Sequence, residues 1–279
     1  MNPKHDQSRD VAAYFGFLKE PFTKEIAAKV PFAGFLSASR KAGFARLRQL
    51  LSRRGLALIT GEVGSCKSTA IRAFAEALEK TPYDWVYIDD PTVGLRGIWN
   101  SIATQLGLNP RFFKWQLMPA LKSAIEKNHH DFGKTTIIVI DDAQLLKPAA
   151  LEELRLFTNF KIDSHSPMTL ILLAQPEFRK LIQLKALEAF NQRLVLRTHL
   201  VGLSQDEAKA YVQHHLEVAG RTAALFTDDV IAEIYQQAKG LPRLINTLCY
   251  ECLWETFEQN KNLVDLPTLE KVLCRLDGV

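Results

Sequence analysis

The chain is poor in the features that mark secreted and membrane proteins. Its 279 residues include four cysteines, too few for a disulfide scaffold, and this scarcity predicts a reducing compartment. No run of about 18 apolar residues occurs in it, so we expect no membrane-spanning helix. Residues 1–10 are polar and lack the apolar core of a signal peptide. These absences together predict a cytoplasmic protein that makes no membrane contact.

A strong charge of either sign is also missing. The net charge of +4 permits nucleic-acid binding but does not require it, because charge indicates a partner only where it is clustered. Apolar residues make up 47% and charged residues 24% of the chain, the balance of a globular protein rather than a disordered one. The length suffices for one large α/β core with a smaller domain, or for two modest domains.

Patterns that bind metal ions are sparse as well. Cys249 and Cys252 have CxxC spacing, but no second pair and no histidine follows them, as a zinc site would require. The run Leu244–Phe257 around them has the pattern of an apolar helix, so we expect buried thiols. The adjacent pair His214 and His215 has no third ligand at a suitable spacing, and we expect both at the surface.

Five short apolar runs alternate with helical patterns in the middle of the chain. We expect strands at Leu56–Thr60, Trp85–Ile88, Thr136–Ile140, Met168–Ala174 and Leu194–Leu200. Apolar runs without polar alternation indicate strands buried on both faces, as in a parallel sheet. The alternation of strands and helices predicts an α/β fold in which helices cover both faces of this sheet.

After Leu203 the strand patterns stop. Ser204 and Glu207 form a capping-box pattern that opens a helix, and further helical patterns continue to the end of the chain. We therefore expect three parts. Residues 1–48 form an N-terminal segment and helix, residues 49–202 the αβα domain, and residues 203–279 a helical lid domain.

A phosphate-binding pattern follows the first expected strand and opens a helix, which is the context of a P-loop. Its residues are Gly61, Glu62, Val63, Gly64, Ser65, Cys66, Lys67, Ser68 and Thr69. A loop at a helix N-terminus points several N–H groups inward, and the helix dipole adds positive potential there. Lys67 would neutralise the β- and γ-phosphates, and the Ser68 hydroxyl would be a ligand of Mg²⁺. The pattern predicts ATP and Mg²⁺ as cofactors.

One position departs from the P-loop pattern, which has glycine where this chain has Cys66. A Cβ and a sulfur at this position would crowd the nucleotide or distort the loop. The thiol would also lie at a helix N-terminus beside Lys67, where its pKa is expected to fall. We expect Cys66 to weaken nucleotide binding or turnover.

Two carboxylates follow the apolar run Ile137–Ile140, in the manner of a Walker B strand. Asp141 would hold Mg²⁺, directly or through water, and Asp142 would polarise the attacking water as general base. Aspartate in place of the longer glutamate at the second position would slow hydrolysis. The sequence thus predicts an ATPase of slow turnover, and it leaves open whether ATP is hydrolysed or only bound.

The motifs together resemble the ExeA-like branch of AAA+ ATPases, which also includes transposition regulators of the TniB/TnsC kind. The matching segments are Phe15-Gly16-Phe17, Pro21-Phe22, Leu58–Gly64, Asp141–Gln144, Ala174–Phe178, Gln192-Arg193-Leu194 and Gly240–Asn246. The resemblance covers nearly the whole chain. It implies an AAA+ P-loop NTPase with a five-stranded parallel αβα sheet and a C-terminal helical lid.

The resemblance also implies roles for residues outside the two nucleotide motifs. Gln175, after the fourth strand, would position the lytic water or sense the γ-phosphate. Arg193 would reach into the site of a neighbouring subunit and stabilise the charge on the transferred phosphoryl group, with Arg197 as the alternative finger. Arg243 would contact the γ-phosphate from the lid. A trans arginine implies a homo-oligomer, in the form of a ring or a helix.

Two aromatic residues near the N-terminus match the same branch. The resemblance implies that Phe17 and Phe22 contact adenine. The alternative is that both rings pack in a hydrophobic core.

The first functional hypothesis is an ATP-dependent regulator of DNA transposition. Such a protein oligomerises on duplex DNA, selects target sites and recruits or activates a transposase. The absence of a membrane segment favours it over secretion ATPases of the same branch. Arg96, Arg111 and Lys114 follow the second strand, where loops of ring ATPases line the pore, and would contact DNA phosphates. The alternative for these three residues is a solvated surface charge.

A second hypothesis is an ExeA-like ATPase that acts on protein partners in secretion or cell-envelope assembly. A third hypothesis follows from Cys66 and Asp142, namely a nucleotide-dependent switch with little turnover, and it is compatible with either of the others.

Overall fold

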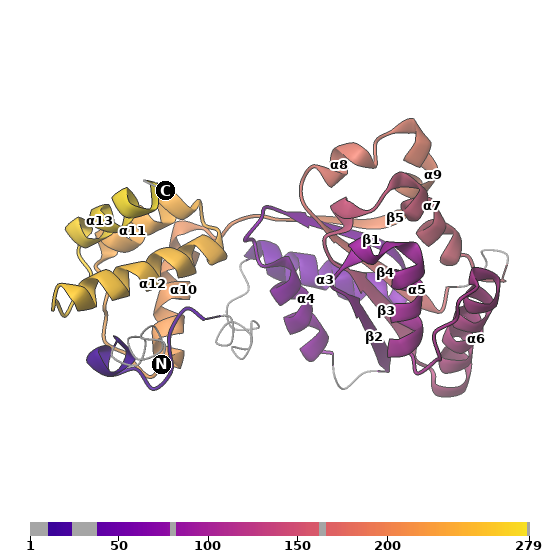
Figure 1. The fold of residues 1–279 in the computed structure, drawn as a ribbon, viewed down its shortest axis with the longest axis horizontal. Coiled ribbons are helices and arrows are strands. Elements are labelled where there is room, and N and C mark those ends of the chain that lie inside the picture. The colour runs from indigo at the N-terminus through magenta and orange to yellow at the C-terminus, as the bar shows by residue number, and fades with distance from the viewer. Residues whose placement is uncertain (1–10, 24–37, 79–81, 162–165, 278–279) are drawn as a thin grey trace. The chain divides into compact units, whose positions relative to one another are not determined.

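The computed structural model describes residues 11–23, 38–78, 82–161 and 166–277 (Figure 1). The chain divides into two compact units. The larger unit comprises Ala38–Val63 and Ala70–Leu200. The smaller unit, called the helical unit below, comprises Met1–Ser37, Gly64–Thr69 and Val201–Val279. The domain boundaries expected from the sequence, after residues 48 and 202, stay predictions.

The larger unit alternates strands and helices along the chain. Its elements are α3 (Ala38–Arg53), β1 (Gly55–Gly61), α4 (Lys67–Glu76), β2 (Tyr83–Ile88), η1 (Pro91–Val93), α5 (Gly94–Gln105), α6 (Lys114–Phe132), β3 (Thr135–Ile140), η2 (Ala143–Leu145), α7 (Pro148–Phe157), β4 (Met168–Ala174), α8 (Phe178–Leu181), η4 (Lys185–Leu187), α9 (Glu188–Gln192) and β5 (Leu194–Leu200). All five strands lie where the apolar runs predict them, and β2 begins two residues earlier than expected.

The five strands form one parallel sheet in the order β2-β3-β4-β1-β5. The central strands β3 and β4 are buried along their whole length, as uninterrupted apolar runs predict. Alternate residues of one strand enter two different cores. Ile138 and Ile140 pack with α5, α6 and α7, whereas Ile137 and Val139 pack with α3 and α4. Helices therefore cover both faces of the sheet, and the expected αβα fold is confirmed (Figure 1).

The helical unit contains α10 (Gln205–Val218), α11 (Asp228–Ala238), α12 (Pro242–Glu258) and α13 (Leu266–Asp277). The capping box predicted at its start is present, because the Ser204 hydroxyl accepts the N–H of Glu207 and the Glu207 carboxylate accepts the N–H of Ser204. The expected C-terminal helical region is thus confirmed. Among the described residues, no helix combines the length and the apolar composition that a membrane crossing requires.

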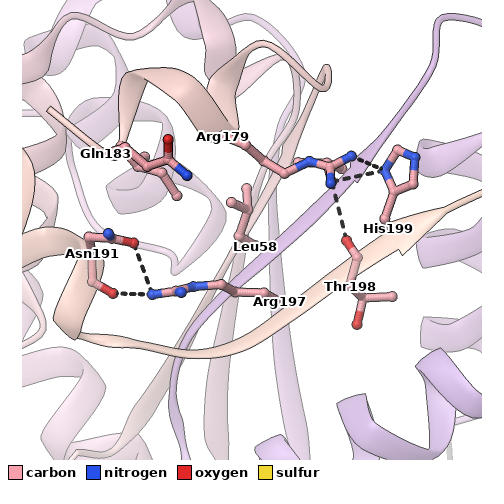
Figure 2. A pocket seen from close by; sticks show the side chains of 9 residues that line it. Leu58, Arg179, Gln183, Asn191, Arg197, Thr198 and His199 are labelled. Atoms are coloured by element: carbon pink, nitrogen blue, oxygen red, sulfur yellow. Dashed lines mark hydrogen bonds between the residues drawn. The ribbon is translucent and has the colours of Figure 1, made fainter.

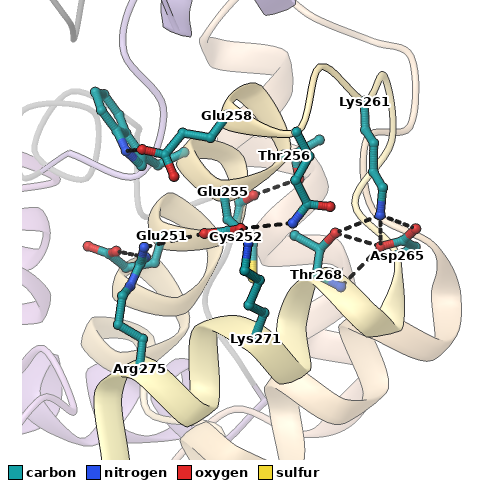
Figure 3. A network of polar contacts seen from close by, with 12 residues as sticks. Glu251, Cys252, Glu255, Thr256, Glu258, Lys261, Asp265, Thr268, Lys271 and Arg275 are labelled. Atoms are coloured by element: carbon teal, nitrogen blue, oxygen red, sulfur yellow. Dashed lines mark hydrogen bonds and ion pairs between the residues drawn. The ribbon is translucent and has the colours of Figure 1, made fainter. Parts of the chain in front are cut away.

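A buried carboxylate joins the last two helices of this unit (Figure 3). Glu255 on α12 is 3% exposed, and its two oxygens contact Lys271 Nζ at 2.6 Å and Arg275 Nη1 at 3.3 Å, both on α13. Arg275 also binds Glu251 at 2.6 Å. The Lys271 hydrogen bond, followed by that of Gln259, lowers the pKa of Glu255. The network fixes α13 against α12.

The cysteine pair of α12 lies in the core of the helical unit, as the apolar helix pattern predicts. Cys249 and Cys252 are both 0% exposed, and burial raises the pKa of the Cys252 thiol to about 12. Within the described parts of the chain, no cluster of His, Cys, Asp or Glu is suited to hold a metal ion.

The expectation that both histidines of the adjacent pair lie at the surface is wrong for His215. This residue is 1% exposed, and its ring stacks on Phe22 with centroids 5.3 Å apart. Burial, followed by the charge of His214, lowers the pKa of His215 to about 4, so the ring is neutral at pH 7. Adjacent histidines on a helix point in different directions, and here one of them points into the core.

Candidate functional site

Three predicted site segments follow the carboxyl ends of parallel strands. The P-loop follows β1 at Gly61, Asp141 and Asp142 follow β3, and Gln175 follows β4. Because β3, β4 and β1 are neighbours in the sheet and run in one direction, these ends lie at one edge. In open α/β sheets, this edge is where ligands bind.

The P-loop connects β1 to the N-terminus of α4, which begins at Lys67. Gly64 and Cys66 have φ angles of 86° and 60°, so Cys66 has the left-handed backbone conformation that glycine adopts without strain. Its sulfur lies 3.7 Å from the Gly64 carbonyl oxygen. A non-glycine residue in this conformation costs about 1–2 kcal/mol. The loop therefore keeps a glycine-type backbone despite the Cβ of Cys66.

The carboxylate of Asp141 is held at both oxygens. Its Oδ1 accepts the main-chain N–H of Asp142 at 2.9 Å, and its Oδ2 accepts the phenolic O–H of Tyr87 at 2.6 Å. A carboxylate is a hard oxygen donor, and Mg²⁺ is bound in proteins by one or two carboxylates together with substrate phosphates. The Asp141 carboxylate is thus a donor of the kind that Mg²⁺ prefers. No local pattern in the sequence points to Tyr87, because only the pairing of β2 with β3 brings it beside Asp141.

Gln144 connects two of the predicted catalytic residues. Its Nε2 donates to Asp142 Oδ1 at 2.9 Å, and its Oε1 accepts the main-chain N–H of Gln175 at 3.0 Å. Asp142 itself has a positive φ of 46°, which turns the chain sharply after β3. Gln144 lies within the Walker B segment, and its sequence position alone indicates no role for it. The carboxamide joins the ends of β3 and β4 at the candidate site.

The two candidate fingers lie in different surroundings. Arg193 follows α9 and is half-buried, whereas Arg197 on β5 is exposed and donates from Nη2 to Asn191 O at 2.6 Å and to Asn191 Oδ1 at 2.9 Å. Arg197 lines a pocket of about 190 Å³ together with Arg179, and Figure 2 shows both guanidinium groups there. Arg193 does not line this pocket.

A histidine in the same pocket connects Arg179 to the end of β1. His199 Nδ1 lies 2.8 Å from Arg179 Nη2 and 3.1 Å from Thr60 Oγ1 (Figure 2). Because a guanidinium group can only donate, Nδ1 of His199 is the acceptor of that bond. Thr60 directly precedes Gly61, so the pocket borders the strand that leads into the P-loop.

Arg243 lies in the first turn of α12, and its main-chain N–H donates to the Gly64 carbonyl oxygen at 3.3 Å. A Cβ added at Gly64 would lie 3.2 Å from Arg243 Cβ, so the two segments approach closely there. The role of the Arg243 side chain stays a prediction.

Phe17 and Phe22 are 8% and 6% exposed and belong to the hydrophobic core of the helical unit. Both rings therefore pack in a hydrophobic core, which is the alternative that the sequence left open. Contact of either ring with adenine stays a prediction.

The three predicted DNA-binding residues lie around the connection between α5 and α6. The guanidinium group of Arg96 stacks over the Phe112 ring at 3.8 Å, which brings α5 against the connection. Lys114 Nζ lies 2.6 Å from Glu153 Oε2, and the main-chain N–H of Arg111 donates to Asn100 Oδ1 at 3.1 Å.

Three exposed aromatic residues lie at the end of this connection and in the first turn of α6. Phe112, Phe113 and Trp115 are 67%, 52% and 71% exposed. The ring centroids of Phe113 and Trp115 are 6.2 Å apart in a stacked arrangement. We call these six residues the basic–aromatic surface: Arg96, Arg111, Phe112, Phe113, Lys114 and Trp115. The three cations of this surface are predicted from the sequence, whereas Phe112 and Phe113 are not.

Both the sequence and the fold of this chain are similar to those of known proteins. Residues 48–182 match the family model described as "AAA domain". The chain is 29% identical to General secretion pathway protein A of Aeromonas hydrophila over 255 residues, which are 90% of this chain. This match covers only 46% of the relative, so the chain spans about half of its length. The similarity agrees with the expected resemblance to the ExeA-like branch.

Several solved structures have folds similar to that of this chain. Cdc6p from Pyrobaculum aerophilum superposes with a TM-score of 0.68 at 15% identity, over 90% of this chain and 70% of that one. The Aeropyrum pernix ORC1 protein in complex with DNA gives 0.66 at 14%, over 90% and 68%. Thermotoga maritima RuvB, in its T158V form, gives 0.61 at 16%, over 89% and 72%. At these identities the similarity shows the fold alone. The chain has the AAA+ P-loop fold, and its residues 48–182 match the model of the AAA domain.

Proposed function

We propose that this protein is an ATP-dependent regulator of DNA transposition, whose ATP-bound form assembles on duplex DNA and recruits or activates a transposase. The observation that carries the DNA part is the basic–aromatic surface. Cations bind phosphates without sequence preference, and exposed aromatic rings add contacts to sugars and bases. An isolated surface charge would not explain why three large aromatic side chains stay exposed beside it.

In the proposed nucleotide site, the N–H groups of the P-loop and the Lys67 ammonium group bind the phosphates. Ser68 and Asp141 would hold Mg²⁺, which would neutralise charge on the β- and γ-phosphates. Asp142 accepts a proton from the attacking water, and Gln175 orients that water. The positive φ of Cys66 and the short side chain of Asp142 favour slow turnover, which suits a protein whose ATP-bound assembly is the signal.

The remaining arginines connect this site to other parts of the assembly. Arg193 or Arg197 would enter the site of the neighbouring subunit, and Arg243 would report nucleotide state to the helical unit. Arg197 is the favoured finger, because this residue is exposed and lines the pocket that also contains Arg179. In this proposal the active form is a ring or helical homo-oligomer.

The test is binding to a fluorescent random-sequence duplex, followed by anisotropy with and without ATP and Mg²⁺. Arg111→Glu reverses a charge on the basic–aromatic surface and is expected to weaken ATP-dependent binding at least about tenfold. Lys127→Glu is the matched control, since Lys127 is exposed on α6 outside this surface. Equal effects of the two substitutions, or no binding of the unmodified protein at low salt, would contradict the DNA proposal.

A second candidate function is an ATPase that acts on protein partners in secretion or cell-envelope assembly. The observation that favours it is the 29% identity to General secretion pathway protein A over 90% of this chain. In this case the exposed aromatic rings would contact a protein, and Arg111→Glu would leave DNA binding unchanged. Trp115→Ala would then weaken the association with such a partner.

A further inference from the structure

Tyr87 lies on β2, which is an edge strand of the sheet, and its side chain is 38% exposed. The phenolic oxygen nevertheless makes a short hydrogen bond, 2.6 Å long, to Oδ2 of Asp141. A tyrosine at a partly exposed strand end has no need of a carboxylate partner, because water would satisfy its hydroxyl. The need for this bond must therefore come from the Asp141 carboxylate and not from the tyrosine.

The second oxygen of the same carboxylate is also occupied. Asp141 Oδ1 accepts the N–H of Asp142 at 2.9 Å, so one donor lies at each oxygen and the carboxylate plane is fixed. A carboxylate oxygen has two lone-pair directions, so accepting one hydrogen bond does not by itself prevent it from binding a metal ion or a metal-bound water. The two hydrogen bonds thus orient the carboxylate.

Tyr87 is itself held in place by a side chain. Its main-chain N–H donates to Gln105 Oε1 at 2.9 Å, and its carbonyl oxygen accepts Gln105 Nε2 at 2.9 Å. The carboxamide of Gln105, the last residue of α5, thereby takes the place of a neighbouring strand at the edge of β2. A side chain is best placed to position another group when its own backbone is fixed, and Gln105 fixes the backbone of Tyr87.

We propose that Tyr87 is a positioning residue for the Mg²⁺ that accompanies ATP, acting through Asp141 and held by Gln105. The inference rests on the proposed nucleotide site. Groups that hydrogen-bond to metal ligands orient those ligands, and their removal lowers metal affinity by about 10- to 100-fold. Because Tyr87 is partly exposed, the effect belongs at the lower end of this range.

The test separates the metal-dependent part of nucleotide binding from the rest. Tyr87→Phe removes one oxygen atom, and the affinity for a fluorescent ATP analogue is measured in EDTA and across a Mg²⁺ titration. We expect the Mg²⁺ concentration at half-effect to rise about tenfold, with the affinity in EDTA changed less than about twofold. Tyr83→Phe is the matched control, since Tyr83 lies on the same strand, four residues away. This substitution is expected to leave both the Mg²⁺ concentration at half-effect and the affinity in EDTA unchanged.

Gln105→Ala is the second variant and keeps the phenol intact. It releases the backbone of Tyr87 and is expected to shift the Mg²⁺ dependence in the same direction by a smaller factor. Circular dichroism establishes that each variant is folded.

An equal loss of affinity in EDTA and in Mg²⁺ would overturn the role of Tyr87, because it would indicate a general distortion of the site. An unchanged or increased Mg²⁺ affinity would overturn it as well. Absence of nucleotide binding by the unmodified protein would instead refute the proposed nucleotide site, and the role of Tyr87 with it.

Discussion

The side-chain amide of Gln144 donates to the carboxylate of Asp142 at 2.9 Å. The other end of the same carboxamide accepts the main-chain N–H of Gln175 at 3.0 Å. Gln144 thus fixes the distance between the proposed general base and the strand end that carries the proposed water-orienting residue. Catalytic groups must be held close to their productive geometry, and such positioning contributes to the rate.

Replacing Gln144 is therefore expected to impair turnover more than binding. In Gln144→Ala, the Asp142 carboxylate loses a hydrogen bond to a charged group, which is worth about 1.5 kcal/mol at the lower end of its range. A loss of this size in the transition state lowers kcat about tenfold. Steady-state ATP hydrolysis gives kcat, and direct titration gives the nucleotide affinity. A kcat equal to that of the unmodified protein would show that Asp142 needs no such support.

Cys66→Gly is expected to improve the P-loop. Cys66 has a φ of 60°, so glycine removes about 1–2 kcal/mol of backbone strain and also the side chain beside the phosphates. We expect tighter nucleotide binding in calorimetric titration, because the side chain beside the phosphates is gone. Cys66→Ala is the informative control, because it removes the sulfur and keeps the Cβ. If alanine restored binding as fully as glycine, the sulfur and not the backbone would be the obstacle.

Glu255→Gln is expected to destabilise the protein by about 2 kcal/mol at pH 7, since a buried carboxylate loses its charge-assisted bonds to Lys271 and Arg275. The folded-state pKa of Glu255 lies below its ordinary value of 4.5. Its stabilisation is therefore fully present above pH 4.5 and is lost as the pH falls through the folded-state pKa.

Urea unfolding of both proteins at pH 7 and at lower pH measures this effect. The two stabilities should converge as the pH falls. Glu258→Gln, an exposed position on the same helix, should change little at either pH. A pH-independent difference between the Glu255 variant and the unmodified protein would contradict the assignment.

Two variants of the basic–aromatic surface are expected to differ in the salt dependence of their DNA binding. Arg111→Ala removes one cation, so the slope of log affinity against log salt should become shallower by about 1 on duplex DNA. Trp115→Ala removes an apolar contact that releases no counterions, so the affinity should fall while the slope stays the same. Binding isotherms over a series of salt concentrations measure both quantities. Identical slopes for all three proteins would show that Arg111 does not contact phosphate.

The sequence predicts the architecture well because its signals are local. Each central strand is an uninterrupted apolar run, as in Ile137–Ile140, and burial on both faces requires this pattern. The P-loop and the paired aspartates were found for a similar reason, since each occupies consecutive positions after a strand. Parallel topology then brings their strand ends to one edge of the sheet.

Contacts between distant segments were not predictable in this way. Tyr87 and Asp141 are 54 residues apart, and only the register of β2 with β3 makes them neighbours. The burial of His215 depends on Phe22 from the N-terminal segment, whereas the local pattern of α10 leaves that position ambiguous. Positive φ at Cys66 follows from its place in the P-loop pattern, where glycine is the rule.

The central claim is that ATP drives assembly on DNA. Negative-stain microscopy of the protein with random-sequence duplex DNA, with and without ATP and Mg²⁺, tests it most directly. Rings or filaments on DNA that form only with ATP and Mg²⁺ are the predicted result. A protein that binds ATP yet shows no assembly on DNA at low salt would contradict the claim and direct the search to protein partners.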